Sequence, residues 1–130
     1  MRRGALWLAG LVLAGAPALA LVVSEIAALS QLERGRWQIS ESDPRKPPRF
    51  ICLRDPMLLV QVEHGPASCT RRVTESGKSG TTVQYRCAGH GFGHTRVVVE
   101  TPRIARIDTQ GIVDGRPFAW RAEARRVGAC

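Results

Sequence analysis

Apolar and polar side chains alternate along most of this chain after residue 35, which is the period of two that half-buried β-strands show. In residues 36–41, for example, Trp37 and Ile39 lie on one face and Gln38 and Ser40 on the other. Segments rich in proline, glycine and serine separate the alternating stretches. Strands are therefore expected at residues 36–41, 49–53, 92–101, 103–113 and from 117 onward, with a hairpin over residues 68–88.

The predicted hairpin has one register that gathers its apolar side chains on a single face. With a turn near residues 77–79, Cys69 lies opposite Cys87. In the same register Val73 faces Val83. Directly opposed residues of an antiparallel pair bring their Cβ atoms close enough for a disulfide bond. The pattern therefore predicts a Cys69–Cys87 disulfide.

Two further cysteines, Cys52 and Cys130, complete an even set of four. By elimination they form a second disulfide, which joins an early strand to the C-terminus. Four cysteines allow three connectivities, and the sequence leaves the other two open. An even cysteine set in a short chain indicates an oxidising compartment.

Two short helical segments are expected outside the sheet. Residues 21–33 place apolar side chains at helical spacing with few helix breakers. After Cys52, Asp55 followed by Pro56 has the form of a helix cap with proline at the first helical position. An extended conformation of residues 58–62 is the alternative to this second helix.

These elements predict a mainly β fold: a single antiparallel sheet of six or seven strands, curved or partly closed in a barrel-like manner. The sheet occupies residues 34–130, with an N-terminal helix over residues 21–33 and one short helix after Cys52. A domain of this size buries only about 60 to 68% of the surface that its unfolded chain exposes. Disulfides are therefore expected to supply a large part of its stability.

Residues 1–20 have the pattern of a cleavable signal peptide. Arg2 and Arg3 precede an apolar stretch, and Ala18 and Ala20 supply the small residues that a signal peptidase requires. Cleavage predicts a periplasmic or secreted protein with no transmembrane span. The alternative is a retained anchor, because residues 4–24 carry no charge and are long enough to cross a hydrocarbon layer of about 30 Å.

The order of several short motifs resembles a known family. The motifs are LERGRW at residues 32–37, the pair Cys52-Leu53, the cysteine hairpin with its Ser/Gly-rich turn, and RRVGAC at residues 125–130. Together they are similar to the exported bacterial family catalogued as domain of unknown function 3617. Residues 54–57 are less acidic than the helical stretch that members of this family often carry there. The resemblance implies a periplasmic four-cysteine protein without an established activity, and it carries over no catalytic residue.

Basic residues outnumber acidic ones by 19 to 11, so the formal charge is +8. Loss of Arg2 and Arg3 with the leader leaves 17 against 11, a charge of +6. Arg71, Arg72 and Arg86 are the candidates for an anion-binding patch, whose partner would be an anionic envelope component or a periplasmic protein. A merely solvated basic face is the alternative. Export and the lack of a recognition-helix or aromatic-interleaved pattern argue against nucleic acid as a partner.

No arrangement of side chains in the sequence amounts to a catalytic or cofactor site. His90 and His94 flank a glycine-rich segment without a third ligand, so no metal site is expected. The serines have no placed base, and neither a phosphate-binding loop nor a dinucleotide motif is present. We therefore expect no catalytic residue and no cofactor, and a hydrolase that uses His90 or His94 is a remote alternative.

The function that remains is a non-enzymatic binding or envelope-associated module. The alternative is a small apolar-ligand carrier in which Trp37, Phe118 and Trp120 line a calycin-like cavity. Gly35 and Trp37 match the Gly-x-Trp that opens the first strand of lipocalin-like and avidin-like barrels. In those barrels an arginine of the last strand stacks on the tryptophan, a role for Arg121 or Arg125.

Overall fold

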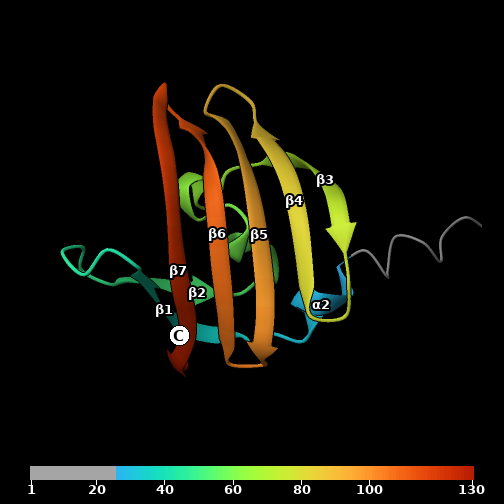
Figure 1. Ribbon diagram of the computed structural model, residues 1–130, viewed down its shortest axis with the longest axis vertical. Coiled ribbons are helices and arrows are strands. Elements are labelled where there is room, and N and C mark those ends of the chain that lie inside the picture. The colour runs from blue at the N-terminus through green and yellow to red at the C-terminus, as the bar shows by residue number, and fades with distance from the viewer. Residues whose placement is uncertain (1–25) are drawn as a thin grey trace, which may run out of the picture.

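The computed structural model describes residues 26–130 (Figure 1). Seven strands form one antiparallel sheet in the order β2-β1-β7-β6-β5-β4-β3. The mainly β prediction is confirmed, and the structure has all the expected strands, with bounds that differ from the expected ones by at most one residue. They are β1 (Gly35–Glu41), β2 (Arg49–Leu53), β3 (Cys69–Ser76), β4 (Gly80–Cys87), β5 (Gly91–Thr101), β6 (Ile104–Val113) and β7 (Arg116–Gly128).

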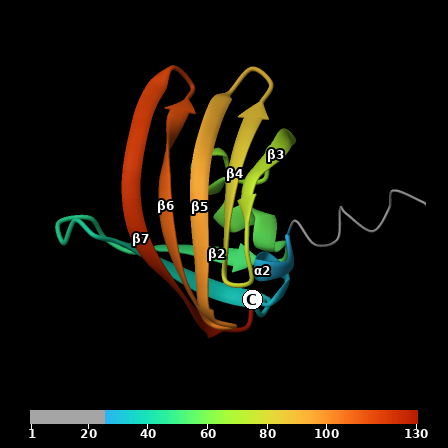
Figure 2. The same ribbon diagram turned by 45° about the vertical axis from the view of Figure 1, so that its right-hand side comes forward.

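The sheet is curved but it does not close into a barrel. Figures 1 and 2 show β4 to β7 side by side, while β1 and β2 run across the lower ends of these long strands. The edges of the sheet are β2 and β3, which do not pair with each other. The chain that connects them, residues 54–68, supplies buried side chains to the core instead of extending either edge. The expectation of partial closure is therefore wrong.

The inner face of the sheet holds the hydrophobic core, and short helical elements cover it. These elements are α2 (Ala27–Ser30) and the 3-10 helices η1 (Pro56–Leu59) and η2 (Val62–His64). Leu29, Leu59 and Val60 are fully buried against the sheet. The Thr95 hydroxyl of β5 donates a hydrogen bond of 2.7 Å to the Val60 carbonyl. This bond satisfies a buried polar group and fixes the connecting segment to the middle of the sheet.

The two helical predictions have different outcomes. The Asp55 carboxylate accepts the Met57 N–H at 2.9 Å, and Pro56 begins η1, so a helix after Cys52 is confirmed in the form of two 3-10 turns. The expected leader at residues 1–20 and most of the expected N-terminal helix lie outside the described residues. Within residues 26–130, no helix has the length and apolar character needed to cross a bilayer.

Both predicted disulfides are present. Cys69 lies opposite Cys87, and Val73 opposite Val83, in the register that the apolar pattern predicted. Cys52 of β2 is bonded to Cys130, so the pairing inferred by elimination is also confirmed. Two disulfides are compatible with an oxidising, exported location.

Candidate functional site

Ion pairs neutralise most of the outer face of the sheet, the face opposite the core. Surface pairs of this kind contribute little to stability, but they cancel the charge of the arginines that form them. Four exposed arginines of β5, β6 and β7 each have a carboxylate within 3 Å. The pairs are Arg96–Glu75 at 2.9 Å, Arg106–Glu100 at 2.6 Å, Arg121–Asp108 at 2.8 Å and Arg125–Glu123 at 2.9 Å.

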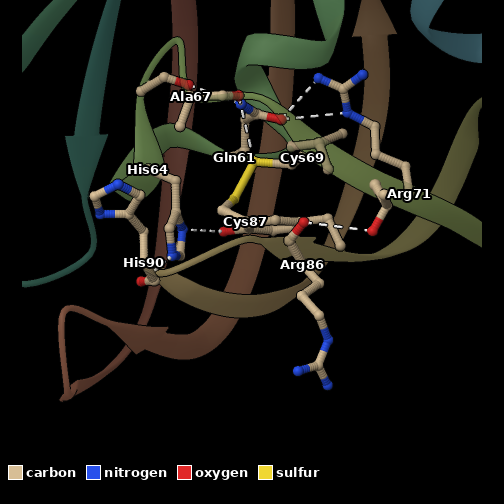
Figure 3. Close-up of a disulfide and its surroundings, with 12 residues drawn as sticks. Gln61, His64, Ala67, Cys69, Arg71, Arg86, Cys87 and His90 are labelled. Atoms are coloured by element: carbon tan, nitrogen blue, oxygen red, sulfur yellow. Dashed lines mark hydrogen bonds between the residues drawn. A yellow bond between two sulfur atoms is a disulfide. The ribbon is translucent and has the colours of Figure 1, made fainter.

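The three arginines predicted as an anion patch border one hollow, but their guanidinium groups diverge. Arg71 donates two hydrogen bonds to the Gln61 carboxamide oxygen, of 3.2 Å from Nε and 2.8 Å from Nη2. Arg86 points to the opposite side of the sheet, as Figure 3 shows. Because neighbouring residues of a strand face opposite sides, Arg72 leaves β3 on the side away from Arg71. Arg72 and Arg86 therefore share the outer face without Arg71.

We call the group Arg72, Gln84, Arg86, Phe92 and His94 the outer-face patch. It surrounds an open hollow of about 380 Å³ on β3, β4 and β5. The Arg86 guanidinium carbon lies 5.9 Å from the centroid of the Phe92 ring, which is a cation–π distance. Among residues 26–130, no carboxylate forms an ion pair with Arg72 or Arg86. The patch therefore has an uncompensated positive charge.

Three members of the patch were not predicted as site residues for an anion. Gln84 lies opposite Arg72 on one side and His94 on the other, and Phe92 lies opposite Arg86. The sequence contains the signal for this grouping, because extending the hairpin register by one strand brings these side chains together. The register of β3 with β4 was derived from the opposed cysteines. No comparable pair of residues indicates the register of β4 with β5.

The two candidate metal-binding histidines, His90 and His94, lie in different environments. His90 Nδ1 lies 3.0 Å from the Asp114 carboxylate at the end of a hairpin. His94 belongs to β5 and stands opposite Gln84 in the outer-face patch. In the described part of the chain, no group of three histidine, cysteine, aspartate or glutamate residues is placed to hold a metal ion.

His64, which sequence analysis did not select, is the buried histidine of the structure (Figure 3). Its Nε2 lies 3.1 Å from the His90 carbonyl oxygen and its Nδ1 lies 3.0 Å from the Tyr85 hydroxyl. A carbonyl oxygen only accepts, so Nε2 carries the proton and Nδ1 accepts from the tyrosine when the ring is neutral. Both ring nitrogens are thus engaged in holding η2 against β4.

The Tyr85 ring occupies space that a glycine leaves open. A Cβ atom at Gly93 would lie 2.4 Å from the Tyr85 Cζ atom. Glycine is therefore required at this position of β5, because any larger residue would displace the ring from the His64 contact. The same geometry buries the phenol, which is 4% exposed.

We expect the stability of the folded protein to decline at alkaline pH because of Tyr85. Burial, followed by the charge of Glu63, raises the pKa of Tyr85 to about 12. An unfolded tyrosine titrates near pH 10. The folded state therefore keeps a proton that the unfolded chain releases, so the stabilisation is complete below about pH 10 and is lost as the pH rises toward 12.

Because the chain contains one tyrosine, the ultraviolet absorbance of tyrosinate reports this titration directly. Urea unfolding measured across the same pH range should show a weaker decline in the Tyr85→Phe variant, which keeps the ring and has no phenol proton. A folded-state midpoint near pH 10 would contradict the prediction.

The aromatic residues proposed to line a ligand cavity lie on the inner face. Trp37 is fully buried, and its indole N–H donates to the Glu33 carbonyl at 2.9 Å. Trp120 is 9% exposed and donates to the Glu63 carboxylate at 2.8 Å. Phe118 packs partly buried against the core. The two indoles are thus engaged in internal contacts, and their role in binding an apolar ligand stays a prediction.

Among the described residues no arginine stacks on Trp37, and the tryptophan with a cation–π contact is Trp120, whose ring centroid lies 4.8 Å from the Arg49 guanidinium carbon. Arg126 is the β7 residue opposite Trp37, where a bulge between Arg36 and Trp37 shifts the register. Arg121 and Arg125 extend from the outer face, where each pairs with a carboxylate. The Arg126 Nε atom donates to the Arg34 carbonyl at 2.8 Å.

Comparison of the chain with family models, with curated proteins and with solved structures finds no match. The resemblance to the exported family catalogued as domain of unknown function 3617 therefore stays a prediction.

Proposed function

We propose that this protein is an exported, non-enzymatic binding module that holds an anionic component of the cell envelope on its outer-face patch. The observation that carries the proposal is the difference between arginines of one face. Arg72 and Arg86 lie together on neighbouring strands without a carboxylate partner among the described residues, whereas four outer-face arginines of β5 to β7 each have one. Arg36, which also has no carboxylate partner among the described residues, stands apart from them on β1. A ligand with negative charge would supply the missing counter-charge.

Arginine suits this role because its planar guanidinium presents several N–H donors in a fixed fork, which matches carboxylate and phosphate oxygens. It is also more weakly hydrated than lysine, so less solvation is lost on binding. The cation–π contact with Phe92 orients the Arg86 guanidinium on the surface before a ligand arrives. A periplasmic or secreted location, which the disulfides favour, would expose this patch to acidic glycans, lipid headgroups and acidic proteins.

Replacing both patch arginines in the variant Arg72→Gln/Arg86→Gln should weaken binding to a soluble polyanion such as heparin by at least about tenfold, since each charge-assisted hydrogen bond contributes roughly 1.5 to 3 kcal/mol. Calorimetry at low and moderate salt measures the loss.

The matched control is Arg36→Gln/Arg106→Gln, which removes the same charge from the same face. Arg36 lies over the exposed Phe50 ring, at 4.5 Å from its centroid, and Arg106 pairs with Glu100. The control should bind within about twofold of the natural sequence, because long-range attraction alone is screened over about 10 Å at 0.1 M salt. Equal losses in both variants would show diffuse attraction in place of a site.

A further inference from the structure

The outer-face patch continues as a straight polar row across the sheet. Strand pairing places Arg72 opposite Gln84, Gln84 opposite His94, and His94 opposite Gln110. These residues come from four neighbouring strands, β3 to β6, and all four side chains are exposed. With strands about 4.8 Å apart, the row is roughly 14 Å long and runs perpendicular to the strands. Within residues 26–130 none of these side chains has a hydrogen bond to another side chain, so their polar groups face solvent.

A second, mostly apolar row lies beside the polar one. Arg86 pairs with Phe92, and Phe92 pairs with Ile112, each two residues along its strand from a member of the polar row. Two residues of a strand span about 7 Å, so the rows are neighbours on the surface. Phe92 is 45% exposed, which is high for a large apolar side chain. The rows together form a narrow strip with charge at the β3–β4 end and an aromatic ring beside the polar groups.

Carboxylates border this strip on the rest of the outer face. Glu75 and Asp108 lie in the next row of outward-facing residues, and each forms an ion pair with an arginine. Glu123, which also pairs with an arginine, lies beyond them. An anionic bilayer laid flat on this face would cover these neutral ion pairs as well as the patch, and it would gain electrostatic attraction only at the patch arginines. A thin, linear ligand can instead follow the strip alone.

We propose that the patch binds a linear acidic polysaccharide, one that carries carboxylate groups on its sugar rings, across strands β3 to β6. This inference rests on the proposed function and specifies its ligand class. Arg72 and Arg86 bind the carboxylates. The carboxamides of Gln84 and Gln110 both donate and accept hydrogen bonds, as sugar hydroxyls require. The exposed face of Phe92 contacts the C–H face of a pyranose ring.

Polygalacturonate is the probe for this proposal, and its fully methyl-esterified form is the uncharged counterpart with the same backbone. The natural sequence should bind polygalacturonate and lose most of that affinity for the ester. Phe92→Ala should weaken binding about tenfold, the effect typical of a central aromatic contact. Phe50→Ala, which removes another exposed phenylalanine that lies beside an arginine, should leave binding unchanged.

Vesicles containing phosphatidylglycerol distinguish the proposed anion-binding function from the narrower proposal that the ligand is a polysaccharide. Vesicle binding that depends on Arg72 and Arg86, without binding of polygalacturonate, would overturn the polysaccharide inference and leave the anion-binding function standing. Absence of binding to polygalacturonate, heparin and vesicles at low salt would overturn both. Equal losses from Phe92→Ala and Phe50→Ala would also overturn the polysaccharide inference, because binding would then not follow the strip. Both side chains are exposed, so both variants should fold, and circular dichroism is the measurement that checks this.

Discussion

Replacement of Cys52 and Cys130 by alanine is expected to lower the free energy of unfolding by about 4 to 5 kcal/mol. The disulfide joins residues 78 apart in sequence, and in the chain-entropy model a loop of that length gives a stabilisation of this size. Small domains have only about 5 to 15 kcal/mol in total, so the double variant should be close to unfolding at room temperature.

The structural reason is the position of this disulfide at one edge of the open sheet. It joins the short edge strand β2 to the end of the chain beyond β7, while β1 lies between them in the sheet. Without the bond, β2 is held by its pairing with β1 and by the packing of Leu53. Edge strands of five residues contribute few ladder hydrogen bonds to resist fraying.

Urea denaturation of the oxidised protein, followed by tryptophan fluorescence, measures the loss. The control is Ala129→Ser, an exposed neighbour of the disulfide that should change stability by less than about 0.5 kcal/mol. A loss below about 1 kcal/mol in the cysteine variant would show that noncovalent packing alone holds the two segments together.

Truncation of Trp37 to alanine should lower the free energy of unfolding by about 3 to 5 kcal/mol, the range measured for large buried aromatic side chains. Trp37 is fully buried in the core, and its indole N–H is bonded to the Glu33 carbonyl. The variant loses both the packing and the hydrogen bond. Trp37→Phe keeps most of the ring volume and should show a smaller loss, of about 1 to 3 kcal/mol, from the unpaired, partly buried Glu33 carbonyl and a small cavity.

This measurement also tests the apolar-carrier alternative. If Trp37 lines a ligand cavity, its truncation enlarges an existing space, so stability should change little while affinity for a lipophilic dye changes strongly. If it belongs to a packed core, stability falls and dye affinity does not. Phe50→Ala, at an exposed aromatic residue, is the control for general effects of removing a ring.

Local patterns in the sequence were sufficient to predict the strands and the disulfide hairpin. Alternation in residues 36–41 matched β1, because a strand that covers a core needs one apolar face. The pairing of Cys69 with Cys87 followed from a single register that also aligned Val73 with Val83. These contacts lie within about twenty residues of each other, so turn geometry and side-chain period determine them together.

The openness of the sheet was not predictable in the same way. A curved sheet of seven strands closes or stays open according to what fills the space between its edges. Here the connection that contains η1 and η2 packs against the inner face, through contacts such as Thr95 with Val60. Thr95 and Val60 are 35 residues apart, and nothing in the pattern of either segment indicates the other.

The candidate site, too, was predictable from the sequence only in part. The amino-acid sequence by itself determined the basic character of the chain and the strand periods, and it indicated the hairpin register that pairs Cys69 with Cys87 and the arginines that are candidate anion ligands. Tertiary structure alone decided that Arg72 joins His94 and Gln110 in one row while Arg71 turns inward to Gln61. The physical reason is that strand period assigns a side chain to a face, whereas the neighbours it meets on that face depend on the register among strands that are distant in sequence.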